Sequence, residues 1–150
     1  MSDAAVHLTE RALPEVPIRQ WVCSLPWGLR ALLGYDRELC AEVLSAFVEE
    51  LLRSLRWRAK RLLGLASVEQ AHPGTVTFIQ RFDSALRLNV HFHTLALDGA
   101  YVRADDAAAG ELVFHALPEP TGDELLDRAA HGFAYRGHPE QAWSLGRRIR

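Results

Sequence analysis

The chain has 150 residues, of which 49% are hydrophobic and 24% are charged. This length and composition suit one globular core and require no second domain. The formal net charge of −2 argues against a protein that coats nucleic acid through its overall charge, although an average of this kind hides local basic patches.

The cysteines and the apolar segments exclude further classes of protein. Cys23 and Cys40 form no Cys-x-x-Cys motif, which argues against a disulfide framework and against a cysteine-built zinc site. Residues 1–17 are polar and resemble no signal peptide, and no apolar run of about 18 residues occurs. We therefore expect a loose leader over residues 1–17, no membrane span and a cytoplasmic location.

The first half of the chain predicts one strand and two helices. Residues 19–25 alternate enough to form a short strand, and Pro26 then begins a short helix that Gly34 closes. Asp36 is the expected N-cap of the longest helix, which ends at Gly64. The apolar side chains along one face of that helix are Leu39, Val43, Phe47, Leu51 and Leu55.

The second half is mainly β-rich. Residues 75–82 and 88–97 are separated by a short loop and predict an antiparallel hairpin. Asp98-Gly99 indicates a turn, Tyr101-Val102 extends the pairing, and residues 111–115 predict a further strand. This order of elements predicts an α+β fold, in which helices cover one face of an antiparallel sheet.

The end of the chain has a different character. Residues 121–130 predict a short capped helix. Residues 134–150 mix glycine, proline and arginine without a sustained period, so we expect a divergent, poorly ordered tail over residues 131–150.

The triplet His91-Phe92-His93 is the main candidate for chemistry. Alternate residues of a strand share a face, which places the two histidines roughly 6 to 7 Å apart along the chain, close enough to share one metal ion. A hairpin centred between Ala85 and Leu86 sets Gln80 opposite His91, so Gln80 is the predicted third ligand.

This ligand set suits a loosely held divalent ion, Mg²⁺ or Mn²⁺, that acts as a Lewis acid. Asp83 and Asp98 are rival third ligands, because the register of the hairpin is an inference. The alternative interpretation is that the two histidines are half-buried structural residues.

Residues 76–102 closely resemble the rolling-circle insertion-sequence transposases, which belong to the HUH group. The resemblance extends from about Arg19 to about Asp127. The matching residues of its central part are Thr77-Phe78-Ile79-Gln80-Arg81-Phe82, Ser84-Ala85-Leu86, Leu88-Asn89-Val90-His91-Phe92-His93 and Leu97-Asp98-Gly99. The resemblance implies an HUH-endonuclease-like catalytic domain over residues 18–130.

The family joins and cleaves single-stranded DNA. A metal ion held by the two histidines polarises the scissile phosphate, and a tyrosine hydroxyl attacks it to form a 5′-phosphotyrosine link. On this resemblance His91 and His93 are metal ligands, with Gln80 as the third.

Two features of the family are missing from the sequence. A cysteine-rich zinc-binding region does not precede the segment, and Tyr35, Tyr101 and Tyr135 do not form the family's pair of tyrosines spaced four residues apart. We therefore expect a partial catalytic domain, truncated or inactive, whose nucleophile is unknown. The alternative is a non-catalytic remnant that binds single-stranded DNA.

The long helix carries a basic run toward its end. Its residues, predicted to contact phosphates and to stack a base, are Arg53, Arg56, Trp57, Arg58, Lys60 and Arg61. A solvated helix end is the alternative explanation, and pairing of Arg53 with Glu49 or Glu50 weakens the patch.

A cupin-type metal enzyme is a second alternative for the histidines. His-x-His followed by a carboxylate such as Asp98 also fits such a site. A cupin needs many more strands than the sequence offers, and the long helix from Asp36 argues against it.

Overall fold

The computed structural model describes residues 13–104, 110–119 and 143–149. Its elements are β1 (Ile18–Ser24), α2 (Trp27–Tyr35), α3 (Arg37–Leu63), the 3₁₀ turn η2 (Val68–Gln70), β2 (Thr75–Phe82), β3 (Leu88–Leu97), β4 (Gly99–Arg103), β5 (Leu112–Ala116) and β6 (Trp143–Ile149). The predicted α+β class is confirmed, because helices pack on an antiparallel sheet. The helix predicted over residues 121–130 lies outside the described residues, and the proposed domain boundaries remain predictions.

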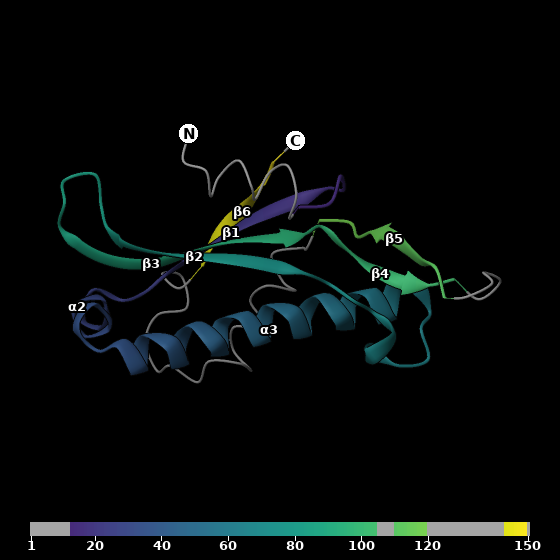
Figure 1. The fold of residues 1–150 in the computed structure, drawn as a ribbon, viewed down its shortest axis with the longest axis horizontal. Helices are drawn as coiled ribbons and strands as arrows, with labels where there is room; N and C mark the ends of the chain where they lie inside the picture. The colour runs from purple at the N-terminus through teal and green to yellow at the C-terminus, as the bar shows by residue number, and fades with distance from the viewer. Residues whose placement is uncertain (1–12, 105–109, 120–142, 150) are drawn as a thin grey trace.

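β3 is an inner strand of the sheet, whose order is β2-β3-β1-β6 with antiparallel neighbours (Figure 1). The predicted hairpin of β2 and β3 is confirmed, whereas the pairing of β1 with β3 joins segments that are far apart in the sequence. β6 pairs with the outer edge of β1, in a segment for which the sequence predicted no regular element.

The ends of α3 are set by local side-chain chemistry. The carboxylate of Asp36 accepts a hydrogen bond from the backbone N–H of Leu39 at 2.9 Å, which satisfies one of the free donors at the helix start. Gly64 ends the helix in the left-handed conformation, with φ of +66°. Both predicted caps are confirmed.

Gly34 has a different role from the predicted one. It does not close α2, which continues to Tyr35. A Cβ atom at position 34 would lie 2.6 Å from a side-chain carbon of Leu88, so the glycine allows β3 to approach the helix closely.

The core lies between α3 and the face of the sheet that the helix covers (Figure 1). The rings of Phe47 and Phe92 stack with centroids 6.3 Å apart. The other large buried apolar side chains are Trp21, Leu25, Leu33, Leu51, Leu55, Val90, Leu97 and Leu117. In the described part of the chain, no helix is both long enough and apolar enough to cross a membrane.

The chain bends at Asp98 and enters a separate hairpin of β4 and β5. Asp98-Gly99 does not reverse the chain as predicted, because β4 leads away from the end of β3 (Figure 1). A Cβ atom at position 99 would lie 2.2 Å from the carbonyl oxygen of His115, so only glycine fits this close pairing.

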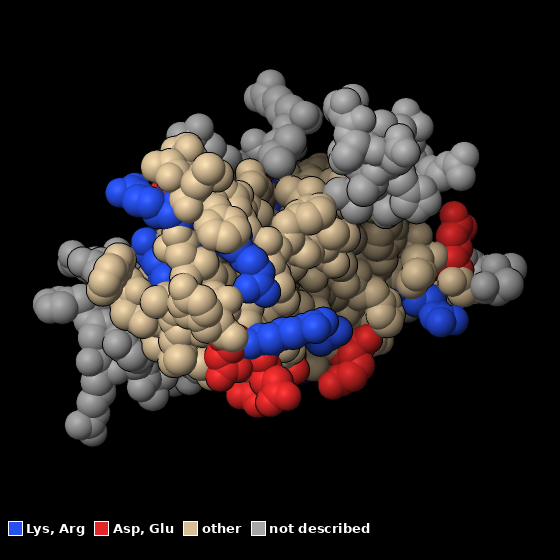
Figure 2. Space-filling model, turned by 60° about the vertical axis from the view of Figure 1, so that its left-hand side comes forward, with Lys and Arg blue, Asp and Glu red and all other residues tan. Residues whose placement is uncertain are grey.

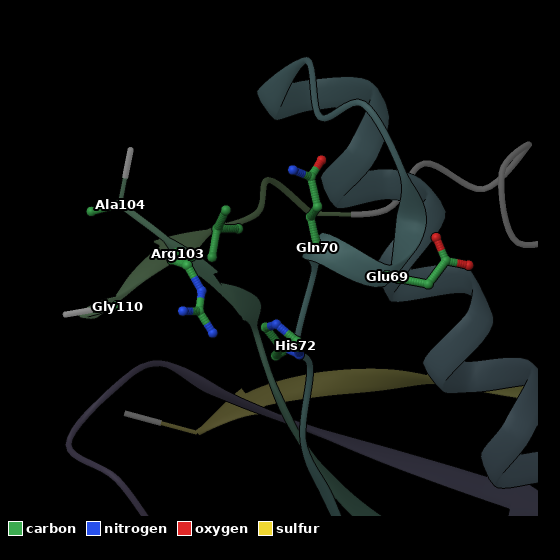
Figure 3. Close-up of a pocket in the computed structure, with 7 residues that line it drawn as sticks. Glu69, Gln70, His72, Arg103, Ala104 and Gly110 are labelled. Carbon is green, nitrogen blue, oxygen red and sulfur yellow. The ribbon is translucent and has the colours of Figure 1, made fainter. Parts of the chain in front are cut away.

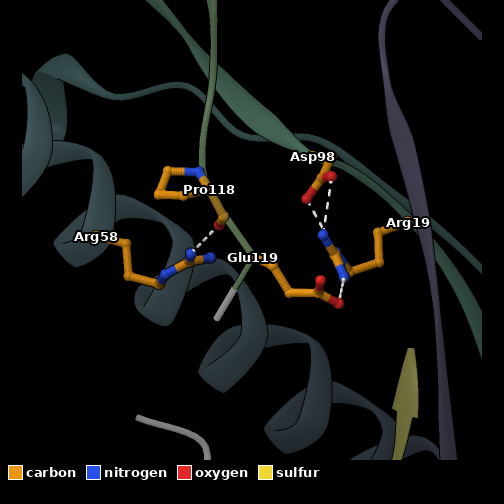
Figure 4. A network of polar contacts seen from close by, with 5 residues as sticks. All are labelled: Arg19, Arg58, Asp98, Pro118 and Glu119. Carbon is orange, nitrogen blue, oxygen red and sulfur yellow. Dashed lines mark hydrogen bonds and ion pairs between the residues drawn. The ribbon is translucent and has the colours of Figure 1, made fainter. Parts of the chain in front are cut away.

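Hydrogen bonds and ion pairs of two buried arginines tie this bend to the rest of the fold (Figure 4). The guanidinium of Arg19 on β1 donates two hydrogen bonds to the Asp98 carboxylate, at 2.9 and 3.0 Å, and a third to Glu119 at 2.9 Å. On α3, Arg58 donates to the carbonyl oxygen of Pro118. The segment that follows β5 is therefore held against both the sheet and the helix.

Candidate metal centre

His91 and His93 lie on the face of β3 that points away from α3. Their neighbours Val90, Phe92 and Thr94 are fully buried on the helix side, whereas both histidines are half-buried. The two imidazole rings have centroids 4.8 Å apart, at an interplanar angle of 62°. Two rings that share one ion have centroids roughly 5 Å apart when each bond to the metal is about 2.1 Å. The prediction that the two histidines share a face is confirmed, and the spacing of their rings fits the binding of one metal ion by both.

The register of the β2–β3 hairpin places Gln80 beside His91, on the face of the sheet that carries both histidines. Gln80 pairs with His91 and Phe78 pairs with His93, as predicted. Directly paired residues have Cα atoms about 4.5 to 5.5 Å apart and side chains on one face. The amide nitrogen of Gln80 donates to the carbonyl oxygen of Phe82 at 3.0 Å, so its amide oxygen is the atom left to bind a cation.

The hydrogen bond of His91 selects the nitrogen that faces a ligand. Its Nδ1 lies 2.6 Å from the backbone carbonyl oxygen of Asn89. A carbonyl oxygen only accepts, so Nδ1 carries the proton and the lone pair of the neutral ring is on Nε2. A histidine that binds a metal commonly donates its second N–H to a carbonyl in this way.

His93 makes its own contact through Gln20 of β1. The side-chain amide of Gln20 lies 2.9 Å from Nδ1 of His93, while Nε2 is buried without a protein partner in the described structure. The Gln20 atom at this distance is the amide nitrogen, which donates to Nδ1 and leaves the proton of a neutral ring on Nε2, so ligation through Nε2 requires the amide to turn and present its oxygen to Nδ1. Burial lowers the pKa of His93, and the charge of His91 lowers it further, which favours a neutral ring.

Neither Asp83 nor Asp98, the two alternative third ligands, has its carboxylate directed to the histidine pair. Asp83 accepts hydrogen bonds from the guanidinium of Arg87 and from backbone N–H groups inside the hairpin loop. Asp98 is buried on the helix side in its pair with Arg19. Within the described ranges no group of three His, Cys, Asp or Glu side chains gathers in one place. The candidate centre is therefore two imidazoles and one amide oxygen, an open set that suits a weakly held ion.

Gln20 and Asn89 are the site residues that sequence reasoning missed. Gln20 lies on the histidine face of β1, and its contact with His93 depends on the pairing of β1 with β3, which the sequence did not predict. Asn89 acts through its main chain, so its residue type carries no signal.

Only some side chains of the basic run on α3 are exposed to solvent. Arg53, Arg56 and Arg61 are exposed, and the ammonium group of Lys60 lies 5.4 Å from the ring centroid of the exposed Trp57. Arg53 pairs with Glu50, as predicted.

Arg58 corrects the prediction for this run. Its side chain is buried and donates to the carbonyl oxygen of Pro118, so it is not available to a phosphate. Position 58 follows Leu55 by three residues and therefore lies on the face of α3 that packs into the core.

A separate pocket lies beside η2 and the end of β4 (Figure 3). It has a volume of about 580 Å³, and its lining combines Glu69 with His72 and Arg103. It contains neither His91 nor His93. We therefore keep this pocket apart from the candidate metal centre.

Among the described residues, neither Tyr35 nor Tyr101 has a hydrogen bond or ring contact with His91 or His93. Tyr35 ends α2, and Tyr101 on β4 packs edge-on against Phe114. Tyr135 lies outside the described residues.

Comparison of the chain with protein-family models, curated proteins and solved structures finds no match. The histidine site and the sequence resemblance are therefore the two observations that bear on the function of this chain.

Proposed function

We propose that this chain is a catalytic-domain fragment of an HUH transposase, which binds single-stranded DNA and a divalent ion at His91 and His93. The observation that supports it most directly is the pair of imidazoles, with centroids 4.8 Å apart on one sheet face. Gln80 stands opposite His91 and supplies the third ligand. The cupin alternative requires a barrel, and the α+β arrangement of α3 on a sheet does not provide one.

Each residue of the proposed site has a separate role in binding or in orienting the ligands. When bound, a divalent ion neutralises charge on a scissile phosphate and polarises its oxygen. The Asn89 carbonyl holds Nδ1 of His91 and directs Nε2 outward, and Gln20 fixes the ring of His93. The half-buried face excludes part of the solvent, which strengthens the electrostatic contacts made there.

The exposed part of the α3 basic run contributes phosphate contacts. Arg56, Lys60 and Arg61 supply the charge, and Trp57 offers a ring for base stacking. Arg53 contributes less, because Glu50 neutralises it.

A second candidate is DNA binding without cleavage by the isolated chain. It is favoured by the positions of Tyr35 and Tyr101, neither of which contacts His91 or His93 in the described structure. We expect no covalent protein–DNA adduct on a denaturing gel after incubation with labelled single-stranded DNA and Mn²⁺. An adduct abolished by Tyr135→Phe would show that this residue is the nucleophile after all.

The metal site is tested by calorimetric titration with Mn²⁺. The wild type should bind, and the His91→Ala, His93→Ala variant should lose the binding heat. His72→Ala is the matched control, because His72 is exposed and lies outside the site. Equal heats from the wild type and the double variant would reject the proposal.

A further inference from the structure

One end of the molecule exposes several large apolar side chains. Trp27 and Tyr35, at the two ends of α2, are 83% and 88% exposed. Phe82 and Leu86, at the β2–β3 loop, are 51% and 81% exposed. Single exposed apolar residues are ordinary, but a group of them indicates an interaction surface. We call this surface the α2–hairpin patch, and it also includes Arg30, Arg37 and Arg81.

Direct contacts hold the two parts of the patch together. The guanidinium of Arg81 on β2 donates to the carbonyl oxygen of Gly34 on α2 at 3.1 Å. Leu88, which pairs with Phe82, packs against the same glycine. Tyr35 and Phe82 therefore flank one point of contact, and Figure 1 shows α2 beside the end of the sheet that carries this hairpin loop.

The hairpin loop presents Leu86 at a conformational cost. Its φ of +58° lies in the left-handed region, which a residue with a branched side chain adopts only at an energetic cost. The side chain is nevertheless exposed and contributes little to the core. Strained positions of this kind are found where function sets the local conformation.

The arginines of the patch keep their charge. Arg30 donates to the carbonyl oxygen of Leu25 at 2.5 Å, and Arg81 likewise has a carbonyl partner, so these hydrogen bonds do not neutralise the guanidinium groups. Among residues 13–104 and 110–119 no carboxylate pairs with Arg30, Arg37 or Arg81, whereas Asp83 is occupied by Arg87.

Arg37 lies at the end of α3 where the helix dipole is unfavourable for a positive charge. It is the first residue of α3, where the positive end of the dipole disfavours a cation. Helix stability therefore does not explain it. Figure 2, which brings the α2 end forward, shows separate basic side chains on a mostly uncharged surface, with acidic groups gathered along the lower edge.

We infer that the α2–hairpin patch binds a short run of single-stranded DNA, with bases stacked on Trp27, Tyr35 and Phe82 and phosphates at Arg30, Arg37 and Arg81. Exposed rings with unneutralised guanidinium groups match unpaired bases on a charged backbone, and paired bases in a duplex do not present their faces. A second copy of the chain is a poorer occupant, because a symmetric dimer would bring like-charged arginines together. The inference rests on the proposed function for its substrate class, but it needs no metal.

The test is fluorescence anisotropy of a labelled oligothymidylate with the full chain in EDTA. We expect the Trp27→Leu, Tyr35→Leu variant to bind at least about tenfold more weakly, because it removes two rings on which bases would stack. Leu112→Ala on β5 is the matched control, since Leu112 is also an exposed apolar residue, and it should bind like the wild type. An Arg37→Gln, Arg81→Gln variant should lower the log–log salt slope by about 1.4.

The outcomes separate the inference from the proposed function. Affinity of the folded Trp27→Leu, Tyr35→Leu variant equal to that of the control would overturn the inference, and so would an absence of DNA binding by the wild type. A dimer seen by light scattering that the same variant abolishes, with DNA affinity unchanged, would assign the patch to a second copy. Absence of Mn²⁺ binding by the wild type, or equal heats from the wild type and the His91→Ala, His93→Ala variant, would reject the proposed metal site and leave this DNA-binding result unchanged.

Discussion

Replacing Asp98 by asparagine tests whether the buried ionic contact fixes the bend between β3 and β4. Asp98 and Arg19 come from positions 79 residues apart, and their side chains are 2% and 5% exposed. The two hydrogen bonds between them measure 2.9 and 3.0 Å. In the Asp98→Asn variant the amide keeps a similar shape but removes the negative charge, so the Arg19 guanidinium remains buried without its main partner.

The cost follows from the burial of the pair. Removing one partner of a buried ion pair costs about 3 to 5 kcal/mol, because the remaining charge is left uncompensated. Glu119 still accepts one hydrogen bond from Arg19 at 2.9 Å, but its side chain is 66% exposed and compensates little. We therefore expect a loss of about 3 kcal/mol in the free energy of unfolding, and a decrease in Tm of roughly 6 to 12 °C.

Urea unfolding followed by circular dichroism measures this loss. Glu119→Gln is the control, and it should cost less than about 1 kcal/mol because that partner is exposed. An Arg19→Met, Asp98→Leu variant, which removes both charges, should be more stable than Asp98→Asn. A loss below about 1 kcal/mol for Asp98→Asn, or a double variant less stable than the single one, would refute the reasoning.

Two further predictions concern the core. Phe47→Ala should lower the free energy of unfolding by about 3 to 5 kcal/mol in the same urea assay, since Phe47 is fully buried; a loss near zero would contradict its central position. Burial raises the pKa of the Cys23 thiol to about 12, so in a Cys40→Ala background alkylation at pH 9 should be slower than that of the urea-unfolded chain by roughly a thousandfold. The stability linked to this thiol is fully present below its ordinary pKa and should fall as the pH rises toward 12, and equal alkylation rates in both states would disprove the burial.

Sequence periodicity was sufficient for the elements that depend on near neighbours. The caps at Asp36 and Gly64 follow from side-chain and backbone preferences within one helical turn. The register that sets Gln80 opposite His91 agrees with a hairpin centred between Ala85 and Leu86, although a β-bulge between Gln80 and Phe82 shifts the pairing next to the loop and sets Phe82 opposite Leu88. These predictions were confirmed because each one involves groups that are close along the chain.

Predictions for the basic run and for the bend were less successful. Arg56 and Arg58 have the same chemistry and lie two residues apart, yet only Arg58 is buried, because its helix position faces the core and Pro118 offers it an acceptor. Asp98 seemed available to a metal ion because its partner, Arg19, is far away in the sequence. The spacing from Leu55 places residue 58 on the core face of α3, but only the tertiary structure supplies the carbonyl acceptor that an arginine buried there requires.

The sequence by itself determined that His91 and His93 share one face, since alternation along a strand is a property of the backbone. Only the tertiary structure decided what surrounds them: β1 brings Gln20 to His93, while Arg19 takes Asp98 to the other side of the sheet. It also brought α2 and the hairpin loop together into one exposed patch. Contacts of this kind join residues that are distant in the chain, and they depend on which surfaces pack together rather than on any local pattern.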